Sequence, residues 1–386
     1  MEIVLLSDIH LGRFKYGKML SSGIDARTQD ILDNIQQALD YAVKNDVRTI
    51  GILGDFYHTK RPAQIFRRLL TSKLEWALNK GIKLYLLLGN HDQGKTHGHD
   101  LVELVELSSQ ISNLEVIEVP KIIEQDDTLL CFLPHVNIFD LNIAATEFHD
   151  YIIKSVKDMA EEVKKRKKKY NYFFGHFGTD KSFAGKSFDM GSDDKCSRVL
   201  PLDLFDPLVW TGVYLGDIHK PQELNGFCRH VGSIARVDFG EEDEKKGFYY
   251  VNGKEDKFIE IKDRDLKTLV VDLVSGNSRE KMGEFCEKVQ DLDLTKSIVR
   301  LRVLIKEEDT KIIDFTGIED YLKENCWNYI GKNLQEQRDQ RQEISLETSG
   351  ELNYISLFRD YVSKIALEDK EEIEKAGEVI LLEIQE

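Results

Sequence analysis

The sequence lacks both a long hydrophobic run and any paired arrangement of its cysteines. No stretch of about 18 or more apolar residues occurs, and the N-terminus leads directly into a predicted strand, so we expect neither a membrane span nor a signal peptide. A cytoplasmic protein is therefore expected, in the host cytoplasm if a phage encodes it. The 5 cysteines are scattered and form no Cys-x-x-Cys pair, which favours reduced thiols over a disulfide framework or a cysteine zinc site.

The chain also lacks an excess of positive charge. Its formal net charge of -16 speaks against a nucleic-acid partner, because Lys and Arg side chains that neutralise phosphates dominate DNA affinity. A local basic stripe matters more than the sum, however, and basic residues follow three of the polar clusters described below. They are Arg13, Lys15, Lys18, Lys60, Arg61, Arg67, Arg68 and Lys220. These residues either ring a site for a polyanion or are ordinary solvated charges.

Polar residues follow five predicted strands at the point where each apolar run ends. The clusters are Ser7-Asp8-Ile9-His10, Gly54-Asp55-Phe56-Tyr57-His58, Gly89-Asn90-His91-Asp92, Gly175-His176-Phe177 and Gly216-Asp217-Ile218-His219. Strands that end on the same edge of a sheet bring residues distant in sequence into one crevice, where ligands bind in open α/β sheets. We therefore expect these five clusters to form one site.

The residue types in these clusters predict a metal site. Aspartate, histidine and asparagine without cysteine suit Mn(II), Fe(II), Zn(II) or Mg(II), and the share of nitrogen ligands argues against calcium. Seven candidate ligands favour two ions over one, and a pair of ions about 3.5–4 Å apart clamps a phosphoryl group from both sides in phosphatases and nucleases. The candidates are Asp8, His10, Asp55, Asn90, His176, Asp217 and His219.

These motifs together resemble those of the calcineurin-like metallophosphoesterase superfamily. More narrowly, Ser7 to Gly12, Gly54 to His58, Gly216 to Gln222 and Gly232 to Glu241 look like segments of SbcD-like nucleases, the bacterial counterparts of the eukaryotic double-strand-break repair nuclease. The resemblance implies an α/β fold, namely a two-sheet metallophosphoesterase sandwich flanked by helices, with a small α/β capping domain and a C-terminal helical tail. It also implies two divalent ions, most typically Mn2+, with Mg2+ as the alternative.

The resemblance further implies a role for each metal ligand. Asp55 is expected to bridge both ions. Asp8 and His10 lie two residues apart at a strand end, so in extended conformation they face the same side and reach one ion, which His219 completes. Asn90 and His176 are expected to bind the second ion. As an alternative, each of these residues merely caps a strand end through hydrogen bonds.

Two histidines are implied to be catalytic without binding metal. His91 corresponds to the family histidine that contacts the scissile phosphate and protonates the leaving oxygen, a task suited to an imidazole with a pKa near neutrality. His58 corresponds to a histidine that positions the phosphate. We expect Asp92 to orient His91 through its other ring nitrogen.

Asp217 departs from the family pattern, which usually has histidine there, as Gly-His-x-His. An aspartate is still able to bind the second ion, and its negative charge favours Mn(II) or Mg(II). The alternative is that Asp217 does not touch the ion and that the second site is weaker.

The chain divides into three predicted segments. Residues 1–262 alternate strands with helical periodicity, as a layered α/β fold does, and are the expected nuclease domain. Residues 263–346 form a small α/β unit, which is a DNA-capping domain by resemblance and otherwise a structural appendage. Residues 347–386 form two amphipathic helices, which either pack on this chain or, by resemblance, bind the coiled-coil base of an SMC-like ATPase.

The resemblance also implies a homodimer. Helical stretches at Ile65 to Leu78 and His99 to Leu107 carry apolar faces that either pair across a two-fold axis or pack within the monomer.

The function implied is that of a two-metal DNA nuclease acting in end processing, recombination and double-strand-break repair as the nuclease subunit of an SbcCD-like complex. It would be a 3′–5′ exonuclease on duplex DNA and an endonuclease on single strands or hairpins. A small-molecule phosphatase or cyclic-nucleotide phosphodiesterase would share every ligand but need neither the second unit nor the tail. A non-catalytic scaffold on the same fold should have lost ligands.

Overall fold

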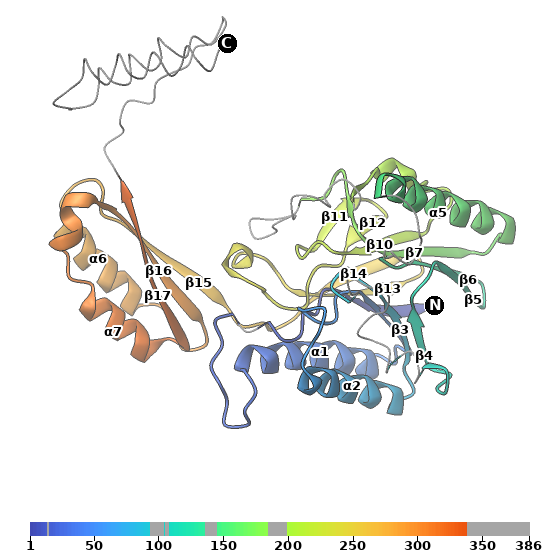
Figure 1. Cartoon of the computed structure of the whole chain (residues 1–386), viewed down its shortest axis with the longest axis horizontal. Helices are drawn as coiled ribbons and strands as arrows, with labels where there is room; N and C mark the ends of the chain where they lie inside the picture. Colours follow the sequence, from blue (N-terminus) through green and yellow to red (C-terminus); the bar gives the residue numbers. More distant parts are fainter. Residues whose placement is uncertain (14, 93–103, 105–107, 136–144, 184–198, 338–386) are drawn as a thin grey trace, which may run out of the picture. The chain divides into compact units, whose positions relative to one another are not determined.

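The computed structural model describes residues 1–13, 15–92, 104, 108–135, 145–183 and 199–337. Two six-stranded sheets lie face to face, with helices on their outer sides (Figure 1). Among the described helices, none combines the length and the apolar character needed to cross a membrane.

The first sheet contains β1 Glu2–Leu6, β2 Thr49–Leu53, β3 Lys83–Leu87, β4 Leu114–Ile117, β13 Gly247–Asn252 and β14 Glu255–Glu260. Its strand order is β14-β13-β1-β2-β3-β4. Strands β1 to β4 are parallel, and β13 runs antiparallel to β1. The central strands are buried on both faces, which explains why they are continuous apolar runs without alternation.

The second sheet contains β5 Lys121–Gln125, β6 Thr128–Leu133, β7 Tyr170–His176, β10 Gly212–Gly216, β11 Gln222–Asn225 and β12 Cys228–His230. Its order is β11-β12-β10-β7-β6-β5. The four central strands are parallel, and the edge strands β5 and β11 are antiparallel to their neighbours. A short parallel pair, β8 Gly178–Thr179 and β9 Val199–Leu200, follows β7 along the chain.

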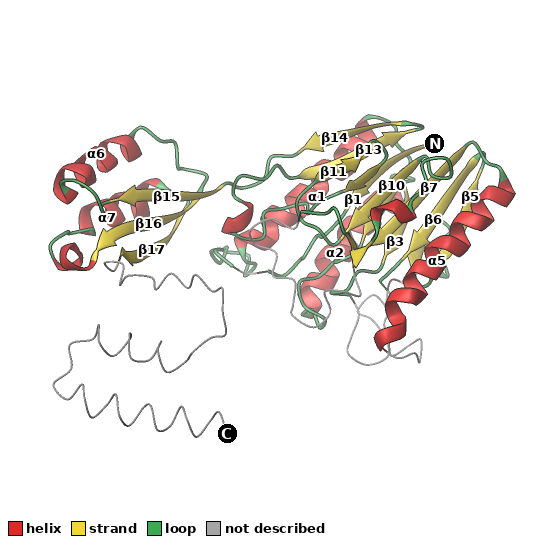
Figure 2. Cartoon of the chain, turned by 90° about the horizontal axis from the view of Figure 1, so that it is seen from above, coloured by secondary structure: helices red, strands yellow, loops and turns green. Residues whose placement is uncertain are grey.

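Helices cover the outer face of each sheet. Helix α1 (Ala26–Lys44) and helix α2 (Gln64–Asn79) pack on the first sheet, and helix α5 (Ala145–Arg166) runs along the second (Figure 2). The space between the sheets is filled mainly by aromatic and aliphatic side chains, among them Tyr85, Phe132, Tyr172, Phe174 and Tyr214. The predicted two-sheet sandwich flanked by helices is therefore confirmed.

A smaller three-stranded sheet follows in sequence. It consists of β15 Leu266–Asp272, β16 Ile298–Lys306 and β17 Asn328–Gln337, with helices α6 Ser278–Gln290 and α7 Thr316–Asn325. Alternate residues of β16 pack with both helices in a separate apolar core that includes Leu301, Val303 and Leu322. The sequence predicted β15, α6 and β16, but not α7 or β17.

The proposed segment boundaries stay predictions. Residues 1–336 form one compact unit, so the division between 262 and 263 is not resolved as a separation of bodies. The predicted tail, 347–386, lies outside the described residues, as does most of the stretch from His99 to Leu107. Helix α2 buries Phe66, Leu70 and Leu74 in the core of its own chain, while Ile65, Leu69, Trp76 and Leu78 are only partly buried, so the homodimer stays a prediction.

Candidate metal centre

The five polar clusters converge where the two sheets meet. Three of them follow β1, β2 and β3 of the first sheet, and two follow β7 and β10 of the second. Because these strands are parallel within each sheet, their carboxyl ends share one edge. All of the predicted site residues lie at this edge, so both sheets contribute to the site.

Two glycines permit the strand ends to approach closely. A Cβ atom on Gly216 would lie 2.3 Å from the carbonyl oxygen of Leu53 and 2.7 Å from Nδ1 of His176. A Cβ on Gly54 would lie 2.3 Å from the same Nδ1, and Gly54 has a φ of +92°, a conformation that favours glycine. The glycines that precede the polar residues are therefore a steric requirement of the site.

The backbone is strained at four of the candidate ligands. Asp8, His10, Asp55 and Asp217 have φ angles of 50°, 48°, 55° and 77°, and they are half of the eight non-glycine residues with positive φ in the described part of the chain. Such conformations cost about 1–3 kcal/mol each and persist only where the surroundings fix them. At Asp8 and His10 backbone hydrogen bonds do so, since their N–H groups donate to the carbonyls of Gly54 and Asp55 at 3.1 and 2.9 Å.

The first group of candidate ligands contains Asp8, His10 and His219. The Nε2 atoms of His10 and His219 lie 2.9 Å apart, and Nε2 of His10 lies 3.5 Å from Oδ2 of Asp55. Oδ2 of Asp8 is buried and has no hydrogen-bond partner. Two imidazole nitrogens face each other beside an unpartnered carboxylate oxygen, so these buried residues fit a divalent metal ion.

The second group surrounds His176. Its Nδ1 lies 2.6 Å from the carbonyl oxygen of Leu53 and therefore carries the proton, which leaves Nε2 to face three oxygen atoms. These are Oδ1 of Asn90 at 3.0 Å, Oδ1 of Asp55 at 3.3 Å and Oδ1 of Asp217 at 3.9 Å. A nitrogen lone pair surrounded by oxygen acceptors requires a proton or a metal ion between them.

The ionisable side chains of the cluster agree with this interpretation. Although burial opposes it, Asp55 and the neighbouring aspartates raise the pKa of His176 to about 10. Burial would raise the pKa of Asp55, but the nearby His176 outweighs it and holds that pKa well below its usual range. Burial raises the pKa of Asp8 to about 6. His176 and Asp8 therefore hold a proton more strongly than usual, and a metal ion would compete with these protons for the same atoms.

His91 and His58 lie beside the ligand cluster. The ring of His91 lies 4.9 Å from the ring of His10, and its backbone N–H donates to Asp55 at 2.9 Å. Donor atoms of His10, His58 and His91 are close enough together to be a third candidate metal group. Burial lowers the pKa of His58 to about 4, with Arg13 adding to the effect, so His58 is neutral at physiological pH.

Asp92 differs from the prediction. Its fully buried carboxylate accepts hydrogen bonds from the backbone N–H groups of Asp55, Phe56 and Gly89 at 2.8 to 2.9 Å. The Nδ1 atom of His91 lies instead 2.9 Å from the carbonyl oxygen of His58. The group that orients the His91 ring is therefore this carbonyl, and Asp92 fixes the loops after β2 and β3.

The sequence interpretation missed one residue pair, Glu241 and Lys246. Oε1 of Glu241 lies 2.8 Å from Nδ1 of His219, and its Oε2 lies 2.9 Å from Nζ of Lys246. Although burial opposes it, Lys246 holds the pKa of Glu241 well below its usual range. In sequence both residues belong to a charged run that is typical of a surface turn, and only the motif ending at Glu241 hinted at a role.

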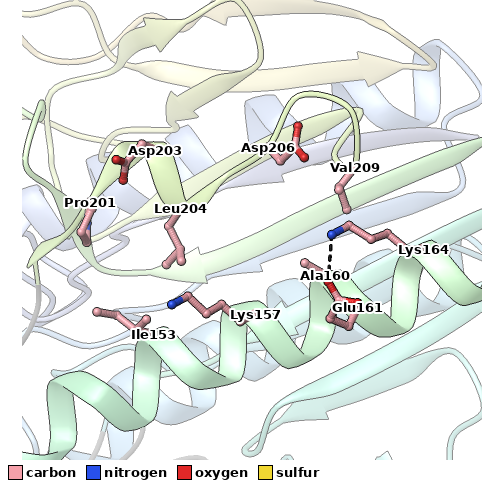
Figure 3. A pocket seen from close by; sticks show the side chains of 10 residues that line it. All are labelled: Ile153, Lys157, Ala160, Glu161, Lys164, Pro201, Asp203, Leu204, Asp206 and Val209. Atoms are coloured by element: carbon pink, nitrogen blue, oxygen red, sulfur yellow. Dashed lines mark hydrogen bonds and ion pairs between the residues drawn. The ribbon is translucent and has the colours of Figure 1, made fainter.

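A cavity of about 400 Å³ lies between α5 and the segment that begins with the 3₁₀ turn Leu202–Leu204 (Figure 3). Lys157 and Lys164 project into it from the helix, opposite Asp203 and Asp206. None of the predicted site residues lines this cavity, so it is separate from the candidate metal centre.

Comparison with known proteins gives a consistent family assignment. Residues 1–221 match the calcineurin-like phosphoesterase family, and this span contains every predicted site residue. The SbcD component of the nuclease SbcCD from Staphylococcus epidermidis is 27% identical over 259 residues, which is 64% of this chain and 65% of that protein. The double-strand break repair protein Mre11 of Sulfurisphaera tokodaii is 30% identical over 94 residues, 24% of this chain and 23% of that protein.

Exonuclease subunit 1 of Enterobacteria phage T4 is 28% identical over 138 residues, 35% of this chain and 38% of that protein. The chain thus covers less than two thirds of the length of each of these three relatives.

Proposed function

Because the chain belongs to the calcineurin-like phosphoesterase family, we propose that it is a metal-dependent phosphodiester hydrolase that cleaves DNA. Relatives with nuclease, exonuclease and double-strand break repair names support the choice of DNA. The observation that carries the metal dependence is the donor set itself, in which Nε2 of His176 faces three oxygens and the Nε2 atoms of His10 and His219 face each other.

We assign seven residues to two divalent ions, with Mn2+ favoured over Mg2+. Asp8, His10 and His219 would hold the first ion, Asn90, His176 and Asp217 would hold the second, and Asp55 would belong to both ligand sets. Support for the shared role comes from its two oxygens, since Oδ2 faces His10 at 3.5 Å and Oδ1 faces His176 at 3.3 Å. When bound, such ions supply a nucleophile at neutral pH and stabilise phosphoryl charge.

His91 acts on the leaving oxygen. Its Nδ1–H donates to the carbonyl of His58, so Nε2 is the atom that holds and delivers a proton. His58, which is neutral because burial lowers its pKa, contributes one N–H that contacts a non-bridging phosphate oxygen without adding charge. Both side chains are half-buried, which admits a substrate phosphate while limiting water.

The remaining assignments extend the same proposal. The enzyme acts from 3′ ends of duplex DNA and within single strands or hairpins, in end processing, recombination and double-strand-break repair. Residues 263–346 cap the bound DNA, and residues 347–386 bind the ATPase subunit of an SbcCD-like complex. The functional form is a homodimer.

A single assay tests the choice of substrate. Linear duplex DNA and p-nitrophenyl phosphate esters are incubated with the protein, with Mn2+ or with a chelator, and with or without an SMC-like ATPase. We expect Mn2+-dependent cleavage of DNA. Hydrolysis of the small esters alone would identify a phosphatase or small phosphodiesterase, and hydrolysis of neither substrate would favour a scaffold; either result overturns the proposal.

A further inference from the structure

The second ring nitrogen of His219 is held by a buried carboxylate. Nδ1 of His219 lies 2.8 Å from Oε1 of Glu241, and Glu241 is 1% exposed. A carboxylate accepts but does not donate, so Nδ1 carries the proton. The opposite nitrogen, Nε2, then carries the lone pair, and this is the atom that lies 2.9 Å from Nε2 of His10.

Glu241 is itself fixed at its other oxygen. Oε2 accepts from the backbone N–H of Val237 at 2.8 Å and pairs with Nζ of Lys246 at 2.9 Å. Lys246 is also 1% exposed, and its ammonium group has three further partners. They are Oγ of Ser233 at 2.9 Å, Oε2 of Glu244 at 2.9 Å and the carbonyl oxygen of His219 at 3.1 Å.

This arrangement has a cost that packing alone does not explain. A buried ion pair is seldom a net gain in stability over apolar side chains of the same volume, because both charges lose their hydration. Here every side-chain polar atom of Glu241 and Lys246 has a hydrogen-bond partner. The bonds lead from Lys246 through Glu241 to Nδ1 of His219, and the other ring nitrogen, Nε2, is the candidate metal-binding atom. Carboxylates placed behind a ligating imidazole set its tautomer and raise its basicity.

We propose that Glu241, held by Lys246, is a positioning residue that fixes His219 in the tautomer able to bind the first metal ion. The proposal rests on the two-metal site of the proposed function. It adds to that site a specific element from the segment 237–246, which lies outside residues 1–221, the span that matches the phosphoesterase family.

The geometry explains why glutamine cannot replace Glu241. If the amide oxygen faces His219, the NH2 group faces the Val237 N–H and the Lys246 ammonium. All three groups are hydrogen-bond donors, so none of them finds an acceptor there. If the NH2 group faces His219, the ring must carry its proton on Nε2 and loses that atom as a ligand. Either orientation weakens the first metal site and leaves the ligands of the second unchanged.

The test measures metal binding and not catalysis. Mn2+ is titrated into the metal-free full-length protein and the E241Q variant by calorimetry, with electron paramagnetic resonance to count free Mn2+. We expect one of the two sites of E241Q to be about 10- to 100-fold weaker and the other to be nearly unchanged. Nitrogen chemical shifts of His219 should also show a smaller share of the Nδ1–H tautomer in metal-free E241Q than in the parent, because the orientation with the NH2 group towards His219 moves the proton to Nε2.

Asp256 on strand β14 provides a matched control for the replacement of a carboxylate by an amide. The carboxylate of Asp256 accepts from the hydroxyl of Tyr214 at 2.8 Å and pairs with Arg229 at 3.0 Å, and it contacts no predicted ligand. D256N should bind both ions as the parent does. If E241Q fails to fold, E241D, which keeps the charge but withdraws it by one methylene, should show a smaller selective loss.

The outcomes separate the two proposals. Failure of the parent to bind Mn2+ would overturn the proposed function. If the parent binds two ions and E241Q, or E241D where E241Q is unfolded, binds them equally well, only the role of Glu241 is refuted. An equal loss at both sites, together with a lower melting temperature in chelator than D256N shows, would also refute it, because that pattern means general structural damage.

Discussion

Replacement of Gly216 by alanine tests whether close approach of the two sheets builds the site. The new Cβ would lie 2.3 Å from the carbonyl oxygen of Leu53 and 2.4 Å from Oγ of Ser7. The Leu53 carbonyl is a backbone group, so it cannot rotate away from the new Cβ as a flexible side chain could. The Leu53 carbonyl also accepts bonds from Ser7 at 2.9 Å and from His176 at 2.6 Å, so its displacement weakens both. We expect the free energy of unfolding of G216A to be about 2–4 kcal/mol lower than that of the parent, because of overpacking and two weakened hydrogen bonds.

The measurement is urea unfolding in chelator, followed by Mn2+ titration of the folded variant. Gly226 provides the control, because a Cβ there meets no heavy atom within 4 Å. G226A should change the free energy of unfolding by no more than about 0.5 kcal/mol. Both substitutions remove the same backbone freedom from the unfolded chain, so their difference isolates the contact. If G216A were as stable as G226A and bound Mn2+ equally, the steric argument would be refuted.

Three further predictions concern the chemistry of the site. H91A should reduce DNA cleavage by roughly 10²- to 10⁴-fold while Mn2+ affinity stays nearly constant, and full activity would exclude the leaving-group role. The raised pKa of His176, about 10 in the folded protein against 6.5 in the unfolded chain, predicts that its protonation stabilises the fold in chelator. This stabilisation should be fully present below pH 6.5 and lost as pH rises through about 10, so the melting temperature should fall over that range. A flat profile would contradict the raised pKa. D217H, which supplies the usual family residue, should shift metal preference from Mn2+ towards Zn2+ in competition titrations, and an unchanged preference would place Asp217 away from the ion.

The residues of the candidate metal site could be located from sequence because each lies at the end of an apolar run. Asp55 and His176 are far apart in the chain, yet both follow buried parallel strands, and parallel strands share an edge. Local pattern was therefore sufficient to predict where they meet. The fold followed from the same alternation of strands and helices.

Other features depend on tertiary contacts that no local pattern carries. Asp92 is adjacent to His91 in sequence, but its carboxylate turns to the backbone of the loop after β2. Lys246 belongs to the run Glu244-Lys245-Lys246, which is typical of a surface turn, yet its side chain is buried. Strand β17 was missed because Asn328–Gln337 is largely polar and shows no clear alternation.

Pairing of β1 with β13 has a consequence for how the protein is made. β1 is synthesised long before β13, and one of its edges stays open until residues 247–252 are synthesised and pair with it. An unpaired central strand is a template for association with other chains. Nascent chains stalled before this point should therefore need protection by a chaperone, and products truncated near residue 240 should accumulate as aggregates instead of partly active fragments.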